Sequence, residues 1–162
     1  MTVPTIEKNL DDLTMTVTTE FEATVERLWR IWEDPRQLER WWGPPGYPAM
    51  FVDHDLSPGS KVTYYMTGPE GEKYHGWWRI LSSRPPHQLE FEDGFADDSG
   101  DPNPDMPITM VRVTLASVSP TTTSMTIVSK FPSLEAMEEL AAMGMEEGLT
   151  AALGQIDSIL EE

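Results

Sequence analysis

The sequence predicts a single α+β domain in which an antiparallel sheet packs against a long C-terminal helix. Three observations support this fold class. An alternating strand pattern leads into two short tryptophan-rich helices, six short strand-like segments follow, and residues 133–160 have apolar side chains at helical spacing. A chain of 162 residues is long enough for one domain with a substantial core. We expect the domain to span residues 1–162, with its core at about 14–160 and a polar lead at 1–12.

Local signals predict the first strand and the two helices after it. Residues 13–21 alternate between apolar and polar side chains, which is typical of a half-buried strand. Thr24 can cap a helix that ends near Asp34, because a residue before proline is pushed out of the helical region. Pro35 suits the first turn of a second helix, which ends with Trp41 and Trp42.

Six segments after the Gly-Pro turn at Gly43-Pro44-Pro45-Gly46 have the composition of strands. They are rich in aromatic and β-branched residues, and turns with glycine or proline separate most of them. The segments are residues 49–54, 61–67, 73–83, 88–94, 109–118 and 121–130. This spacing favours an antiparallel meander, which an acidic, proline-rich loop interrupts at residues 96–107.

The C-terminal segment has a helical period that Ser133 can cap. One continuous helix of about 27 residues would be ~40 Å long, so it must lie across several strands. Gly144 and Gly148 lie one turn apart in it, and each costs roughly 0.8–1 kcal/mol relative to alanine. Two explanations stay open. The missing side chains leave space for a ligand or a helix kink, or another element packs closely against them.

Composition excludes several classes of function. Lysine and arginine number 11 against 28 aspartates and glutamates, and the net charge of −17 would repel nucleic acid and anionic membranes. The absence of cysteine excludes disulfides, thiolate catalysis and cysteine-bound zinc. The sequence shows no N-terminal signal segment and no apolar run of about 18 residues. We therefore expect a cytoplasmic protein, monomeric or homodimeric, without membrane insertion.

The residues that bind metals are few and poorly spaced. The histidines are His54, His75 and His87. None has the spacing of a helical metal-binding pair. The loop that begins at Asp97 starts like a calcium loop, but Pro102 stands in place of its turning glycine and Ile108 in place of its bidentate glutamate. We expect no metal and no cofactor.

Catalytic motifs are equally sparse. Glu90 and Glu92 share one strand face and could act as a paired acid and base if that face were buried. Leu89 and Phe91 on the other face favour the simpler interpretation, in which both glutamates face solvent. We expect no catalytic residue. If the chain is nevertheless an enzyme, the polar groups expected to reach its substrate are Tyr64, His75, Arg79 and Arg112.

Several motifs resemble those of a known family. In chain order they are Val25-Glu26-Arg27-Leu28-Trp29, Asp34-Pro35, Trp41-Trp42-Gly43-Pro44, Pro58-Gly59, Gly68-Pro69-Glu70-Gly71, Gly76, Pro85-Pro86 with Leu89-Glu90-Phe91, and Met143-Gly144-Met145-Glu146-Glu147-Gly148. With these motifs, residues 14–160 resemble the bacterial homologues of the activator of the heat-shock protein 90 ATPase, within the START-like (SRPBCC, birch-pollen-allergen-like) superfamily. Ser60 and Leu56 depart from the family pattern, which usually has glycine and often has arginine there.

The resemblance implies a helix-grip fold, in which a curved antiparallel sheet wraps around a C-terminal helix and leaves a cavity. It implies no single reaction, because the superfamily includes lipid and hormone carriers, polyketide cyclases and aromatases, and chaperone partners. We expect a small hydrophobic or aromatic ligand, held by burial of apolar surface. The residues expected to bind it are Trp32, Leu38, Trp41, Trp42, Phe51, Tyr64, Met66, Trp78, Phe91, Phe95, Met110, Met145 and Leu149.

Neighbouring aromatic residues leave the lining of the cavity open in detail. Successive strand residues point to opposite faces, so either member of Tyr64-Tyr65 and of Trp77-Trp78 can enter the cavity. The same choice exists for Trp41 and Trp42, one of which we expect to pack inward while the other covers the turn.

Two alternative functions stay open beside ligand binding. From Phe131 onward the chain has eight acidic residues and no basic one. This face is either simply solvated, or it attracts a basic protein partner, as in a stress-response adaptor that binds its partner weakly. The other alternative is a polyketide cyclase-like or aromatase-like enzyme.

Overall fold

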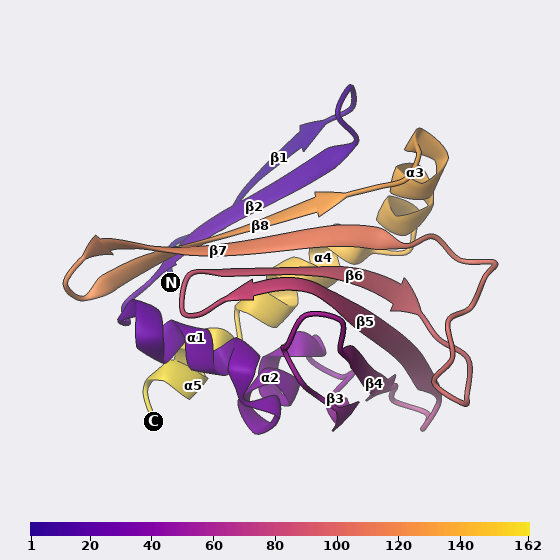
Figure 1. Cartoon of the computed structure of the whole chain (residues 1–162), viewed down its shortest axis with the longest axis horizontal. Coiled ribbons are helices and arrows are strands. Elements are labelled where there is room, and N and C mark those ends of the chain that lie inside the picture. The colour runs from indigo at the N-terminus through magenta and orange to yellow at the C-terminus, as the bar shows by residue number, and fades with distance from the viewer.

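The computed structural model describes residues 1–162 as one eight-stranded antiparallel sheet with five helices. The strands are β1 (Thr5–Asn9), β2 (Thr14–Phe21), β3 (Ala49–Asp53), β4 (Lys61–Thr67), β5 (Lys73–Arg84), β6 (Gln88–Phe95), β7 (Thr109–Ser119) and β8 (Thr122–Lys130). The helices are α1 (Val25–Glu33), α2 (Pro35–Trp42), α3 (Leu134–Ala142), α4 (Met145–Leu153) and α5 (Ile156–Leu160). The predicted helix-grip α+β fold is confirmed, with α4 behind the curved sheet (Figure 1).

The order of strands in the sheet is β1-β2-β8-β7-β6-β5-β4-β3. Strands β3 to β8 form the predicted meander, and β8 then pairs with β2, so the last strand returns beside one of the first. The alternation predicted for residues 13–21 is confirmed, because Met15, Val17 and Thr19 of β2 are buried and the residues between them are half-buried.

Both short helices begin and end as predicted. The Thr24 hydroxyl accepts a hydrogen bond of 3.2 Å from the backbone N–H of Arg27 at the start of α1. Asp34 ends α1 with extended backbone, and its carboxylate accepts 2.9 Å from the N–H of Arg36 to cap α2. One aspartate therefore fixes the angle between the two helices that carry four tryptophans.

The polar N-terminal lead contains a strand that the sequence pattern does not predict. Residues Thr5–Asn9 form the edge strand β1, which pairs with β2 in the register Thr5↔Thr18. Four of its five side chains are exposed, so backbone hydrogen bonds hold it and no hydrophobic alternation marks it in the sequence.

The continuous helix predicted over residues 133–160 is also wrong, because the segment is divided into α3, α4 and α5. Ser133 caps α3 as expected, and its hydroxyl accepts 3.0 Å from the N–H of Ala136. Gly144 then takes a left-handed conformation with φ of 86°, which turns the chain before α4. After α4, the N–H of Gln155 donates to the carbonyl of Ala152, three residues earlier in the chain. This tighter turn, of the kind found in a 3-10 helix, precedes α5.

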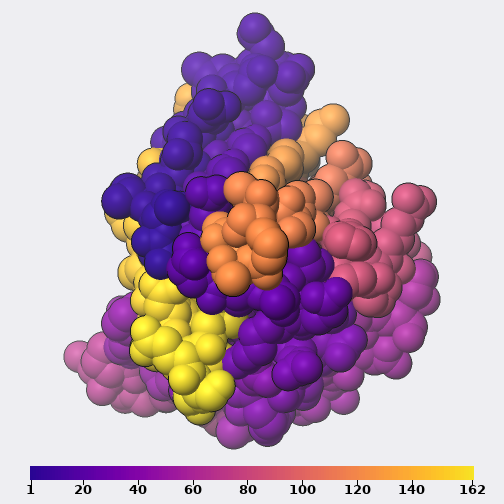
Figure 2. All heavy atoms as spheres, turned by 90° about the vertical axis from the view of Figure 1, so that its left-hand side faces the viewer, coloured from indigo at the N-terminus to yellow at the C-terminus, as the bar shows by residue number.

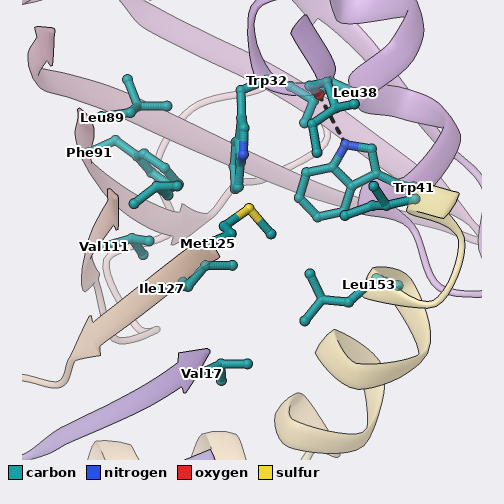
Figure 3. Packing of buried hydrophobic residues seen from close by; sticks show 14 of the residues in the cluster. Val17, Trp32, Leu38, Trp41, Leu89, Phe91, Val111, Met125, Ile127 and Leu153 are labelled. Carbon is teal, nitrogen blue, oxygen red and sulfur yellow. Dashed lines mark hydrogen bonds between the residues drawn. The ribbon is translucent and has the colours of Figure 1, made fainter. Parts of the chain in front are cut away.

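The core lies between the concave face of the sheet and the helices. Side chains from α1, α2, the strands and α4 meet there, including Trp32, Trp41, Phe91 and Leu153 (Figure 3). The C-terminal residues lie against the N-terminal ones (Figure 2), and the ammonium group of Met1 pairs with Asp157 at 3.0 Å. None of the helices combines the length and the apolar character that crossing a membrane requires.

Candidate functional site

A cavity of about 600 Å³ lies between the sheet and the C-terminal helices. It is lined by 23 residues, of which 14 are hydrophobic. They come from the end of α1, from α2 and the turn after it, from strands β4 to β8, and from α3 and α4. The space therefore spans most of the width of the sheet and has a predominantly apolar wall.

Part of the predicted ligand site lines this cavity. The residues found there are Trp32, Trp42, Tyr64, Met66, Phe95, Met145 and Leu149. Trp32 and Tyr64 belong to the buried core cluster and the other five pack against it, so the cavity continues the hydrophobic core.

Other predicted site residues lie elsewhere. Leu38, Trp41, Phe51, Trp78 and Phe91 are fully or almost fully buried in the core and do not line the cavity. Trp41 donates its indole N–H to the carbonyl of Ile31 at 3.0 Å, and Trp78 stacks on Phe91 with ring centroids 4.2 Å apart. Side chains engaged in this way have no surface left for a ligand.

Met110 lies on the opposite face of the sheet and is 47% exposed. The buried face of β7 carries Thr109 and Val111 instead. Alternation along a strand explains the difference, because neighbours of an inward residue point outward.

The structure also shows which members of the neighbouring aromatic pairs face the cavity. Trp42 lines the cavity while Trp41 lies in the core, and Tyr64 lines it while Tyr65 packs under Lys73, whose ammonium group lies 4.7 Å from the ring centroid. Of the third pair, Trp78 is the member that enters the core, so neither tryptophan of β5 reaches the cavity.

Three partly exposed side chains form the rim of the cavity. Tyr47 follows α2, Tyr74 is the second residue of β5 and Met143 directly follows α3, and all three line the cavity. The rings of Tyr47 and Tyr74 face each other with centroids 6.1 Å apart. The mouth thus lies beside the Gly-Pro turn, and no residue of the acidic loop at 96–107 lines the cavity.

A carboxyl group lies at one end of the apolar wall. Asp93 of β6 lines the cavity, and its Oδ1 accepts a hydrogen bond of 3.2 Å from the hydroxyl of Tyr64. Burial raises the pKa of Asp93 to about 7, although the hydrogen bond from Tyr64 and the nearby N–H of Trp78 oppose this shift. Burial, together with the negative charge of Asp93, raises the pKa of Tyr64 well above its ordinary value.

Three indole N–H groups near this end have no hydrogen-bond partner. They belong to Trp32, Trp42 and Trp78. Their rings form one cluster, with centroids of Trp42 and Trp78 4.9 Å apart and those of Trp32 and Trp42 6.0 Å apart. Since buried donors ordinarily find acceptors, the cluster concentrates unused hydrogen-bonding capacity beside Tyr64 and Asp93.

Asp93 is a site residue that was not predicted from the sequence. Position 93 shares a strand face with Leu89 and Phe91, and this was the signal that could have identified it. Glu90 and Glu92 lie on the other face, where Glu90 pairs with Arg112 at 3.6 Å. The two glutamates therefore do not form an acid and base pair inside the cavity.

Among the other polar groups named from the sequence, Tyr64 and His75 line the cavity, whereas Arg79 and Arg112 do not. His75 lies 3.9 Å from Asp98 of the acidic loop. The Asp97 carboxylate accepts the backbone N–H groups of Ser99 and Asp101 at 2.9 and 3.0 Å, which makes it a turn-forming residue. No group of three or more histidine, aspartate or glutamate residues is placed to hold a metal ion.

Comparison with known proteins agrees with this architecture. Residues 22–161 match the family described as Activator of Hsp90 ATPase homolog 1-like protein, which confirms the resemblance read from the motifs. No curated protein matches significantly.

Solved structures include two similar bacterial proteins. A crystal structure of a protein from Mycobacterium smegmatis is 47% identical with a TM-score of 0.89, and the match covers 97% of this chain and 96% of that one. A solution structure of a protein from Arthrobacter aurescens is 48% identical with a TM-score of 0.93, over 99% of this chain and 92% of that one. DynU16, from the dynemicin biosynthetic locus, shares the fold at 18% identity and a TM-score of 0.64, over 93% of this chain and 48% of that one.

Proposed function

The chain belongs to the family of Activator of Hsp90 ATPase homolog 1-like proteins, and we propose that it binds a small, mostly apolar or aromatic molecule in its cavity. The observation that carries this proposal is the cavity itself. Its volume of about 600 Å³ falls in the range of small-molecule sites, roughly 300–1,000 Å³. A well-packed core leaves few voids larger than a water molecule, so we interpret a space of this size as a ligand-binding site.

Gly148 supports the same conclusion from the helix side. It lines the cavity inside α4, and a Cβ added there would meet nothing within 4 Å. Close packing against another element, one of the two explanations for this glycine, therefore does not apply. A helical glycine lowers stability by roughly 0.8–1 kcal/mol relative to alanine. Here the missing side chain keeps the cavity open.

Flexible side chains complete the binding wall. Met66, Met143 and Met145 line the cavity from β4, the end of α3 and the start of α4. The unbranched thioether adapts its shape and is polarizable, which suits a ligand surface made of rings or alkyl groups.

The acidic C-terminal helices give a weaker argument for a protein partner. Glu138, Glu139 and Glu147 are exposed, as a solvated face requires, and Glu146 is paired with Lys8 of β1. Part of the acidic charge is thus already neutralised within the chain.

Filling the cavity from α4 tests the proposal. We expect Gly148→Leu to abolish saturable binding of naphthalene, measured by isothermal titration, while the protein keeps its fold by circular dichroism. Ala151→Leu is the matched control, because Ala151 is exposed on the same helix and does not line the cavity. Equal naphthalene affinity in both variants would contradict the proposal.

A further inference from the structure

Three polar side chains cross the floor of the apolar cavity on adjacent strands. We call Asp93 of β6, Thr109 of β7 and Ser129 of β8 the polar stripe. Thr109 is 5% and Ser129 3% exposed, so both hydroxyls are largely withdrawn from bulk water. Neither hydroxyl makes a hydrogen bond within the protein. Both open onto the cavity, whereas the three indole N–H groups are fully buried.

The sheet register places Asp93 and Thr109 side by side and Ser129 diagonally across from Thr109. Asp93 and Thr109 are direct partners across β6 and β7, and Ser129 is the partner of Val111, which follows Thr109 on the same face. Neighbouring strands lie about 4.8 Å apart, so Asp93 and Thr109 offer polar groups at roughly that interval, whereas Ser129 lies diagonally from Thr109, at about 7–8 Å. Its surroundings are apolar, since Val111 and Ile127 also line this part of the wall.

The stripe can pair with groups that both donate and accept hydrogen bonds. Each hydroxyl of Thr109 and Ser129 donates once and accepts twice. The carboxyl of Asp93 uses Oδ1 for Tyr64, which leaves Oδ2 for a ligand. No lysine or arginine lines the cavity, so an anionic ligand would meet Asp93 without a compensating charge.

From this arrangement we propose that the polar stripe selects neutral ring molecules that carry hydroxyl groups along one edge. The inference rests on the cavity-binding function proposed above and names the chemistry of its ligand. The rings occupy the apolar space against Met145 and Leu149, and the hydroxyl groups pair with Asp93, Thr109 and Ser129. These three residues are specificity-determining, because an apolar ligand would leave their polar groups unpaired.

Matched probes separate the two proposals. We would measure the affinities of naphthalene, of a naphthalenediol with meta hydroxyl groups, and of the naphthylmethylammonium cation at pH 7 by isothermal titration. The variants are Thr109→Val, which keeps the shape of the side chain, and Ser129→Ala. The control is Thr114→Val, at an exposed position on the other face of β7.

The wild-type protein should bind the diol more tightly than naphthalene. Thr109→Val and Ser129→Ala should each reduce this preference by about 3- to 10-fold, the worth of one neutral hydrogen bond, and leave naphthalene binding in place. Thr114→Val should keep the wild-type preference.

Other results would overturn the inference in distinguishable ways. If naphthalene binds as tightly as the diol, or if the three variants behave alike, the stripe does not select hydroxyl groups although the cavity binds. If the ammonium probe binds more tightly than the diol, Asp93 selects cations and the neutral class is wrong. If no probe binds, the proposed function fails together with this inference.

Discussion

The hydroxyl of Tyr64 reaches across strand β5 and donates a hydrogen bond of 3.2 Å to Asp93. The residue of β5 beneath the ring is Gly76, which is the partner of Tyr64 in the sheet register. A Cβ added to Gly76 would lie 2.3 Å from Cζ of Tyr64 and 2.4 Å from its hydroxyl oxygen. The missing side chain therefore lets the tyrosine lie over the strand and orient the carboxyl at the end of the cavity.

The first prediction concerns the pH dependence of stability. The folded-state pKa of Asp93, about 7, lies above its ordinary value of 3.8. Protonated Asp93 therefore contributes stability that is fully present below pH 3.8 and is lost as the pH rises through about 7. Asp93→Asn cannot ionise, so its free energy of unfolding should rise relative to wild type by up to about 4 kcal/mol above pH 7.

Urea denaturation of both proteins between pH 4 and pH 8 would check this. The difference in unfolding free energy should grow steadily with pH and level off above the folded-state pKa. A difference that stays constant over the range would show that Asp93 is ionised and solvated in the folded protein.

A second prediction follows from the contact between Gly76 and Tyr64. Gly76→Ala should lower the free energy of unfolding by on the order of 1–3 kcal/mol, because the ring must leave its place between Phe51 and Trp42. In a double-mutant cycle, Gly76→Ala should cost much less once Tyr64→Ala has removed the ring. Additive costs in denaturant unfolding would argue against the close approach.

The two glycines of the C-terminal segment should respond to alanine in opposite directions. Gly144→Ala should lower the unfolding free energy by about 1–2 kcal/mol, because the left-handed conformation strains any residue with a Cβ. Gly148→Ala should raise it by up to about 1 kcal/mol, because Gly148 is helical and its Cβ would meet no atom within 4 Å. Thermal unfolding of both variants would measure this, and stabilisation by both would favour one continuous helix.

Much of the fold could be predicted from local patterns. The turns and the alternation of β-branched and aromatic residues located the meander, and Thr24, Asp34 and Pro35 located α1 and α2. The sequence offers the break at Gly144 only as one explanation of the two glycines, because apolar residues continue at three- and four-residue steps through it. Strand β1 was not predicted because backbone hydrogen bonds to β2 hold it in place. Such bonds do not require a particular pattern of side-chain polarity.

The candidate site was predictable only in its apolar half. Aromatic and methionine side chains indicate an apolar environment, but the same composition describes Trp42 in the cavity wall and Trp41 in the core. Asp93 belongs to the site because of strand register and the reach of Tyr64 across β5, which are tertiary relationships. A polar residue at an inward strand position is the sequence signal that deserved more weight.

The cavity as a binding site is tested most directly by nuclear magnetic resonance of the methionine methyl groups during titration with naphthalene. The account predicts that the signals of Met66 and Met145, which line the cavity, shift together and saturate with one dissociation constant. The signals of Met50 and Met110, exposed elsewhere, should stay in place. Shifts confined to Met50 and Met110, or shifts at all positions that never saturate, would contradict the claim that the cavity binds a small molecule.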